Sequence, residues 1–310
     1  MARSNHSHKI KSTPLAFFGT AEFSLYSLRS LVEQGFNVEL VVTKPAKYGK
    51  RGRQKLQPAV QTYAQNQNIP CIQPPDKSSL LEYFNEDEHP LWGVVSAYGH
   101  IIPDATLSRF KGGLVNVHPS LLPKWRGPSP IESALLHGDS ETGNSLIRLT
   151  GSMDAGPIYA QSKYLIPEKA DRPMLYEALG QDGAKLLTDN LEQILAGEIK
   201  PTDQDDDEAT YSTMLAKSDA KIDWSQAALS IERQIRAFKG WPGSRTQING
   251  VYVTIESAEI TDRNGETGSY RAIEDDLIVY AKDYGLKVNT LKPSGKNTMS
   301  GADFIRGYLE

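Results

Sequence analysis

The chain contains almost no cysteine: among its 310 residues there is one, Cys71. A single thiol excludes an internal disulfide framework and a cysteine-rich metal site. The sequence places no second thiol and no spaced histidines near Cys71. We therefore interpret this residue as core or loop packing rather than as a catalytic group, and we expect no metal.

Long hydrophobic runs are also missing. Apolar residues make up 39% of the chain, but no uninterrupted apolar run reaches membrane-spanning length. Residues 1–13 are polar and basic and lack the hydrophobic core of a signal peptide. We expect residues 1–13 to be a disordered leader and the protein to be a soluble, cytoplasmic monomer.

A glycine-rich phosphate loop is the third absence. Gly19 and Thr20 follow the first predicted strand, where such a loop would begin, but the second and third glycines are not there. Glu22 would also place a negative charge where a pyrophosphate meets a helix N-terminus. The sequence therefore argues against a nicotinamide or flavin cofactor.

Strands and helices alternate through the first two thirds of the chain. Apolar runs predict strands at residues 15–18, 38–42, 70–72 and 93–97. Helical spacing predicts a first helix after the turn at Gly19-Thr20, with apolar positions from Phe23 to Val32. It also predicts helices around 58–67 and near 79–84, and one last helical stretch over 165–200. This alternation predicts an α/β fold with a doubly wound, mostly parallel sheet that binds its ligand at the carboxyl ends of the strands.

A different pattern begins after the acidic run at residues 203–208, which has no core-forming side chains. Short alternating segments follow, and Asn249-Gly250 and Asn264-Gly265 are turns typical of hairpins. These segments predict a small, OB-like antiparallel β-barrel. The predicted domains are the α/β domain at 14–202, a linker at 203–213 and the barrel at 214–310.

Asn116, His118 and Asp154 are the candidate catalytic residues. Asn116 and His118 are two positions apart at the end of a predicted strand, so both side chains point to one side of the sheet. An amide that donates to an oxyanion and an imidazole that exchanges protons suit attack on a carbonyl group. Asp154, on a Gly-Pro turn, would favour the protonated imidazole. From spacing alone, a structural histidine and a turn-capping aspartate explain these residues equally well.

The sequence shows no activated nucleophile near these residues. Ser120 is the nearest hydroxyl, but the glycines of a nucleophile elbow do not flank it. Direct transfer from a donor to an acceptor amine is therefore favoured over a covalent enzyme intermediate.

Four blocks occur in the order of a known family: Ser-Ala-Tyr-Gly-His-Ile-Ile-Pro at 96–103, Asn-Val-His-Pro-Ser-Leu-Leu-Pro at 116–123, Arg-Gly-Pro-Ser-Pro-Ile at 126–131 and Met-Asp-Ala-Gly-Pro-Ile at 153–158. Together they resemble the folate-dependent formyltransferase family, which implies a Rossmann-like domain and 10-formyltetrahydrofolate as formyl donor. The resemblance also implies that Asn116, His118 and Asp154 are catalytic. It implies folate contacts from Ser120, Leu121, Leu122 and Pro123 in one turn, and from Ala97, Tyr98 and Gly99 beside the pteridine.

The resemblance implies a mechanism as well. An unprotonated amine attacks the formyl carbon, and Asn116 and protonated His118 stabilise the oxyanion. Asp154 keeps His118 charged and helps to move the amine proton.

A basic stretch at residues 44–55 bears on which amine is formylated. It carries six cations and no acid, and it resembles an insertion that the tRNA-directed members of the family use against the acceptor stem. Cations on such a loop can grip phosphates, although a charged run is also compatible with an ordinary solvated surface. The predicted tRNA contacts are Lys47, Lys50, Arg51, Arg53 and Lys55.

Segments at 215–242 and 293–306 resemble the start and end of the C-terminal domain of those same members. The sequence therefore predicts formylation of methionyl initiator tRNA, for translation initiation. Two alternatives stay open. Pro119 and the slight excess of acids after residue 206 favour a small amine, either a nucleotide-linked amino sugar or glycinamide ribonucleotide. An RNA-binding protein without catalysis is the other, but the intact trio of polar residues argues against it.

Overall fold

A computed structural model describes residues 10–48, 55–85 and 90–309. Contacts divide the chain into two compact units. The first comprises Met1–Pro130, Glu141–Leu165 and Tyr176–Ser212, and the second comprises Ile131–Ser140, Ile166–Leu175 and Thr213–Glu310. The domain boundaries given above stay a prediction.

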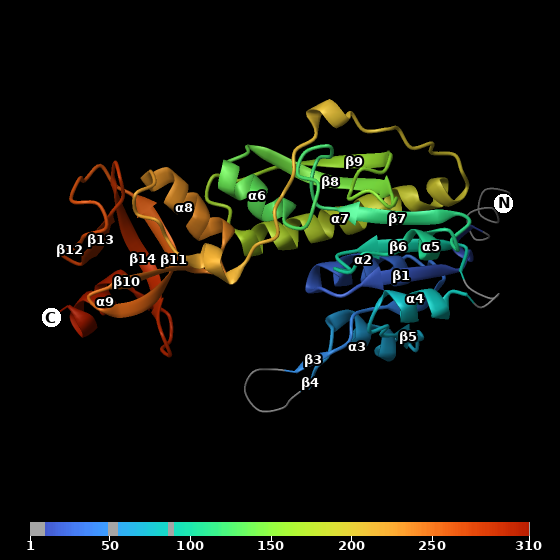
Figure 1. Ribbon diagram of the computed structural model, residues 1–310, viewed down its shortest axis with the longest axis horizontal. Coiled ribbons are helices and arrows are strands. Elements are labelled where there is room, and N and C mark those ends of the chain that lie inside the picture. Colours follow the sequence, from blue (N-terminus) through green and yellow to red (C-terminus); the bar gives the residue numbers. More distant parts are fainter. Residues whose placement is uncertain (1–9, 49–54, 86–89, 310) are drawn as a thin grey trace. The chain divides into compact units, whose positions relative to one another are not determined.

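A seven-stranded sheet forms the centre of the first unit, in the order β5-β2-β1-β6-β7-β8-β9 (Figure 1). Its strands are β1 (Leu15–Gly19), β2 (Val38–Val42), β5 (Cys71–Ile72), β6 (Trp92–Ser96), β7 (Gly113–His118), β8 (Glu141–Arg148) and β9 (Ile158–Leu165). The first five strands in this order are parallel, and β8 and β9 add to the edge in antiparallel fashion. The strand order reverses between β1 and β6, and in such sheets ligands bind beyond the carboxyl ends of the strands at that point.

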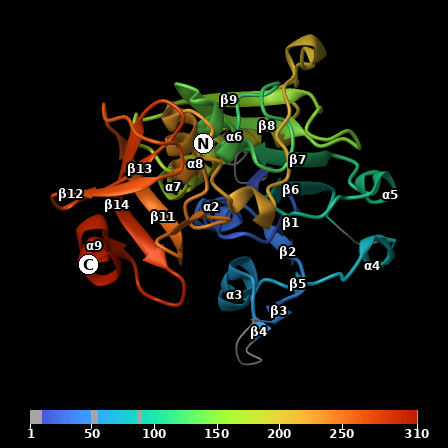
Figure 2. The same ribbon diagram turned by 60° about the vertical axis from the view of Figure 1, so that its left-hand side comes forward.

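Alternating side chains on the strands create two apolar faces, which helices cover (Figure 2). Phe17 packs with residues of α2 (Glu22–Glu33), α3 (Ala59–Asn66) and α7 (Arg172–Leu195). The next residue, Phe18, packs on the opposite face with Phe84, which follows α4 (Lys77–Tyr83), and with residues close to α5 (Asp104–Leu107). Full burial of such a side chain contributes about 1.5–3 kcal/mol to the stability of the fold. Because side chains alternate along a strand, this stabilisation acts on both helical layers.

The prediction of one helix over 165–200 is wrong at its start. β9 continues to Leu165 and α7 begins only at Arg172. The last residues of β9 alternate between partly buried and exposed, as expected for an edge strand with one solvated face. β8 was not predicted either, because its polar residues between Thr142 and Ser145 lack the apolar alternation of a typical strand.

The second unit is built on an antiparallel sheet in the order β10-β11-β14-β13-β12, and β15 also pairs with β14. Its strands are β10 (Ser244–Ile248), β11 (Val251–Ile260), β12 (Tyr270–Ile273), β13 (Asp276–Tyr280), β14 (Gly285–Pro293) and β15 (Met299–Ser300). Ile231 and Ile235 of α8 (Ala228–Ala237) and Phe304 of α9 (Gly301–Tyr308) pack against the sheet. α6 (Pro130–His137) also belongs to this unit, except for its first residue.

The turn between β10 and β11 follows from two residues. Asn249 and Gly250 have φ of 48° and 75°, the conformation that a two-residue hairpin turn requires and that Asn-Gly favours. This sheet is a half-barrel rather than a closed one in the part of the chain described. The predicted fold class, a doubly wound α/β domain followed by a small OB-like β domain, is confirmed.

The basic stretch lies between β2 and α3. Its ends form the antiparallel pair β3 (Lys47–Tyr48) and β4 (Lys55–Leu56), in which Lys47 is opposite Leu56 and Tyr48 is opposite Lys55. Lys50, Arg51 and Arg53 lie outside the described residues. We refer to residues 47–56 as the basic hairpin.

A search of the helices in the described ranges finds none that is both long and apolar enough to cross a membrane.

Candidate active site

β7 supplies two of the three candidate catalytic side chains. Val115 and Val117 point into the core beneath α7, so Asn116 and His118 point to the other side. Only 8% of Asn116 and 4% of His118 is exposed. Buried polar side chains need partners, and both find one in Asp154.

The structure brings the three predicted residues together. Asn116 Nδ2 lies 3.5 Å from Asp154 Oδ1, and His118 Nδ1 lies 3.7 Å from Asp154 Oδ2. Asp154 lies 38 positions after Asn116 and 36 after His118 in the sequence, so only the fold could place its carboxylate beside the strand. The amide, imidazole and carboxylate therefore form one cluster.

The His118 ring faces an acceptor on each side. Its Nε2 lies 3.0 Å from the backbone oxygen of Trp125, and a carbonyl oxygen only accepts, so Nε2 carries a proton and donates. Its Nδ1 faces the Asp154 carboxylate. Both ring nitrogens of His118 therefore have a polar neighbour within the site.

Asp154 lies on a turn with an unusual backbone. Its φ is 48°, in the left-handed region that few residues other than glycine, asparagine and aspartate adopt. Gly127 N donates to Asp154 Oδ2 over 2.8 Å. A Cβ on Gly127 would lie 2.8 Å from the Ser212 backbone oxygen, so this donor position requires glycine.

Residues 204–212, which sequence reasoning assigned to a linker, contact both loops of the site. Gln204 Nε2 donates to the backbone oxygens of Asp154, at 2.8 Å, and Gly156, at 2.7 Å. Arg126, of which 3% is exposed, donates from Nε to Gln204 Oε1 over 3.0 Å and from Nη2 to Asp206 Oδ1 over 2.7 Å.

The second half of the 204–212 segment runs alongside the loop that follows His118. Thr210 N donates to the Pro123 oxygen, Arg126 N donates to the Thr210 oxygen, and Ser212 N donates to the Arg126 oxygen. The sequence did not predict these contacts, because the acidic residues at 203–208 look like a solvated linker. The uncharged Thr-Tyr-Ser at 210–212 was the one available signal.

The predicted folate turn, Ser120 to Pro123, is tightly hydrogen-bonded. Ser120 Oγ donates to the Lys124 oxygen over 2.6 Å, which occupies the hydroxyl within the turn. Ser145 Oγ donates to the Ser120 oxygen and accepts from Leu122 N. Gln161 Nε2 donates to the Leu122 oxygen. Ser145 and Gln161, which the sequence did not point out, therefore fix the shape of this turn.

The second predicted folate segment, Ala97 to Gly99, follows β6 at the point where the strand order reverses. Ala97 and Gly99 have φ of 42° and 72°. The Tyr98 ring packs edge-on against Phe18 in the core, and burial raises the pKa of its phenol to about 12. The backbone oxygen of Tyr98 accepts a hydrogen bond from Thr20 Oγ1 over 3.0 Å, so the side chain and the carbonyl of this residue are both held within the protein.

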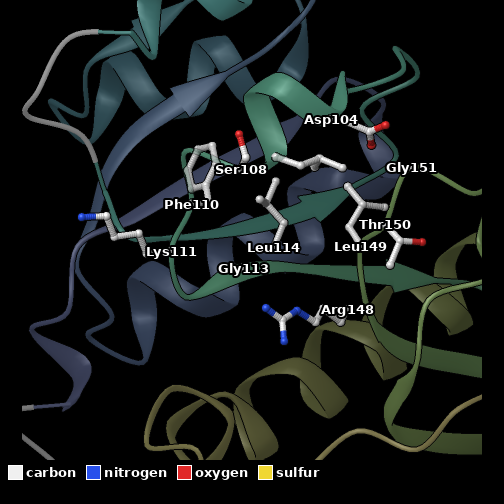
Figure 3. A pocket seen from close by; sticks show the side chains of 11 residues that line it. Asp104, Ser108, Phe110, Lys111, Gly113, Leu114, Arg148, Leu149, Thr150 and Gly151 are labelled. Carbon is white, nitrogen blue, oxygen red and sulfur yellow. The ribbon is translucent and has the colours of Figure 1, made fainter.

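A separate pocket of about 390 Å³ lies at the start of β7, whereas His118 ends that strand (Figure 3). Gly113, Leu114, Arg148 and Leu149 line it together with residues of α5. A Cβ on Gly151 would lie 2.3 Å from Asp104 Oδ1, so the chain leading to Asp154 passes close to α5. None of the predicted site residues lines this pocket.

Comparison with known families identifies the family. A family model described as formyl transferase matches residues 15–191, and one described as formyl transferase, C-terminal domain, matches residues 214–309. The chain belongs to the formyl transferase family. The prediction of a formyltransferase enzyme is therefore confirmed.

Relatives in the formyl transferase family match nearly the whole chain. Methionyl-tRNA formyltransferase of Nitrosomonas eutropha is 33% identical over 302 residues, which span 95% of this chain and 94% of that one. Methionyl-tRNA formyltransferase of Roseiflexus castenholzii is 36% identical over 303 residues, or 96% of both chains.

Solved structures show the same fold at lower identity. An N-formyltransferase from Helicobacter canadensis, in complex with folinic acid and dTDP-3-aminofucose, has a TM-score of 0.67 at 21% identity and matches 88% of this chain and 98% of that one. HypX from Aquifex aeolicus has a TM-score of 0.68 at 16% identity and matches 96% of this chain. This formyl transferase spans about half of the HypX chain, 49% of its length.

Proposed function

We propose that this formyl transferase transfers the formyl group of 10-formyltetrahydrofolate to the amino group of methionyl initiator tRNA. The observation that carries the proposal is the cluster of Asn116, His118 and Asp154, which holds the groups that acyl transfer to an amine needs. The relatives that match 95% of the chain at 33–36% identity, all named methionyl-tRNA formyltransferase, support the choice of acceptor.

Asn116 and His118 act on the oxygen of the formyl group. Asn116 Nδ2 and the protonated ring of His118 are donors that can stabilise the negative charge as it develops on that oxygen. Because both side chains sit on a buried strand, they are oriented before the substrates bind.

Asp154 and His118 handle the proton. The amine nitrogen forms a bond to the formyl carbon while the bond from that carbon to the folate nitrogen breaks, and one amine proton must reach the leaving nitrogen. Asp154, next to both Asn116 and His118, is placed to accept the proton and pass it on.

The residues present fit a reduced folate. The turn from Ser120 to Pro123, whose shape its hydrogen bonds fix, and the segment from Ala97 to Gly99 lie where parallel strands end, which is where such sheets bind their ligands. When bound, the folate supplies the activated formyl carbon. We include Ser120, Leu121, Leu122, Pro123, Ala97, Tyr98 and Gly99 in the proposed folate site.

The basic hairpin is the proposed tRNA-binding element. The pairing of β3 with β4 fixes the base of a loop whose sequence supplies Lys50, Arg51 and Arg53. As part of the same proposal, Lys47 and Lys55 contribute charge at its base, the enzyme works as a monomer, and the reaction takes place in the cytoplasm, where initiator tRNA is used.

A small-amine acceptor remains the second candidate because Pro119 precedes the folate turn, as it does in the glycinamide-ribonucleotide enzymes that this stretch resembles. One assay separates the two. Purified protein and 10-formyltetrahydrofolate are incubated with charged initiator tRNA, charged elongator tRNA, glycinamide ribonucleotide or a nucleotide-linked amino sugar. We expect formyl-methionyl initiator tRNA as the main product. Product from a small amine and none from initiator tRNA would reject the proposed acceptor.

A further inference from the structure

We propose that Gln204 is a positioning residue for the reaction: its side-chain amide clamps the turn that carries Asp154 and so keeps this carboxylate beside Asn116 and His118. The inference rests on the proposed function, and it concerns a residue whose side-chain amide is bonded to Arg126 and to the backbone of the Asp154 turn.

The first observation is the way in which the amide is used. Both hydrogen bonds donated by Gln204 Nε2 go to the Asp154 turn, one to the Asp154 oxygen and one to the Gly156 oxygen. These two bonds fix the direction of the Asp154–Ala155 and Gly156–Pro157 peptide groups, which lie at the start and the end of this part of the turn. The turn needs such support, because Asp154 has a φ of 48°, which costs energy for a residue with a side chain.

The second observation is what holds Gln204 itself. Arg126 Nε donates to Gln204 Oε1, so the amide oxygen is occupied and the NH₂ group must face the turn. Arg126 is buried and is held in turn by Asp206 and by the backbone of Thr210 and Ser212. Thr202 and Ile158 also exchange two backbone hydrogen bonds, from the N of each residue to the oxygen of the other. This pairing holds the chain just before Gln204 next to the residue that follows the Asp154 turn.

The third observation is how little else orients the carboxylate. Gly127 N holds Asp154 Oδ2 at 2.8 Å, but the approaches to Asn116 and His118 are 3.5 and 3.7 Å. These distances are at or beyond the limit of a hydrogen bond, so a small shift of the turn changes the contact with both residues. A misplacement of about 1 Å can reduce turnover about 100-fold.

The test compares two substitutions at Gln204 with a matched glutamine elsewhere. Gln204→Leu removes the donor and the acceptor, whereas Gln204→Glu keeps an acceptor for Arg126 and removes only the donors. Gln234→Leu is the control, since Gln234 Nε2 also donates to two backbone oxygens, those of Asp219 and Lys221, within the second unit.

We expect both Gln204 variants to lower kcat about 10- to 100-fold, with KM for the folate and for the tRNA changed less than about 3-fold. Gln234→Leu should lower kcat less than about 2-fold, even if it costs a similar amount of stability. Normal kcat in Gln204→Glu together with a loss in Gln204→Leu would show that only the contact with Arg126 matters and would overturn the proposal.

A double-mutant cycle with Asp154→Ala separates positioning from general destabilisation. If Gln204 acts through the Asp154 carboxylate, Gln204→Leu should lower kcat less than about 3-fold once that carboxylate is gone. An equal loss with and without Asp154 would overturn the proposal.

Hydrogen exchange provides a readout that needs no substrate. Peptides covering residues 149–158 should exchange faster in Gln204→Leu than in the wild-type protein, and at the wild-type rate in Gln234→Leu. Unchanged exchange in Gln204→Leu would refute the clamp even in an active enzyme. Faster exchange in a protein that formylates no tRNA would instead leave the clamp standing and reject the proposed function.

Discussion

At the scale of single residues, the candidate site contains residues that could be predicted from the sequence and contacts that could not. Asn116 and His118 could be predicted, because two-residue spacing at a strand end fixes their common side. The partners of Arg126 could not: Gln204 and Asp206 lie 78 and 80 positions away in a segment that looks like a solvated acidic run. Local patterns report periodicity and turn chemistry, but pairing across such distances depends on the whole fold.

Asn116→Ala tests the proposed oxyanion donor. Removing one such donor costs about 100- to 1,000-fold in kcat in enzymes of this kind, and we expect a loss in that range with little change in KM. The measurement is formylation of initiator tRNA at saturating substrate. Asn190→Ala is the control, because Asn190 Nδ2 donates to the Leu186 oxygen within α7, away from the cluster. A loss of less than about 10-fold for Asn116→Ala would argue that another group stabilises the oxygen.

At the scale of elements, the parallel part of the first sheet was predictable and its antiparallel edge was not. β1 and β6 are mainly apolar and buried along most of their length, and β2 is apolar apart from the exposed Glu39, which is close to the pattern of a strand covered on both faces. β8 is buried as well, but with Thr142, Asn144 and Ser145 inside, so burial there follows from its position between β7 and β9 rather than from its own composition. The basic hairpin is the opposite case, because its charge could be read from the sequence whereas its paired base required the structure.

The triple variant Lys50→Ala, Arg51→Ala and Arg53→Ala tests the basic hairpin as an element. Each cation that neutralises a phosphate releases counterions, so we expect KM for tRNA to rise and the slope of log affinity against log salt to fall by about 2 to 3. The kcat should stay close to normal, since the Asn116, His118 and Asp154 cluster is untouched. Lys77→Ala, Lys163→Ala and Lys200→Ala in one chain form a charge-matched control. An equal change in both triple variants would assign the effect to net charge rather than to the hairpin.

At the scale of the whole molecule, the chain forms two units with separate cores, and the residues of the proposed function lie in the first. Every residue of the Asn116, His118 and Asp154 cluster and of its hydrogen-bonded supports belongs to the first unit, as does the basic hairpin. The second unit has its own core around Ile231, Leu291 and Phe304. In the sequence, the spacing of apolar residues changes from helical alternation to short hairpins after the acidic run, which is why a second domain is predicted there; the predicted boundaries stay a prediction.

The stability of the molecule should fall in alkaline solution. Burial raises the pKa of the Tyr98 phenol from 10.0 to about 12 and that of the Cys71 thiol from 9.0 to about 11. The folded protein therefore holds these protons more tightly than the unfolded chain, so the stabilisation is complete below about pH 9 and is lost as the pH rises towards 12. For Tyr98, two pKa units correspond to at most about 2.7 kcal/mol.

Denaturant unfolding at pH 8, 9, 10 and 11 measures this loss. In Tyr98→Phe, which has no ionisable phenol, and in Cys71→Ala, the free energy of unfolding should fall less steeply with pH than in the wild-type protein, even if each variant starts from a lower value at pH 8. Tyr252→Phe is the control for Tyr98→Phe, because 70% of Tyr252 is exposed. If Tyr98→Phe and Tyr252→Phe both retain the wild-type slope, burial of the Tyr98 phenol does not govern the alkaline limit.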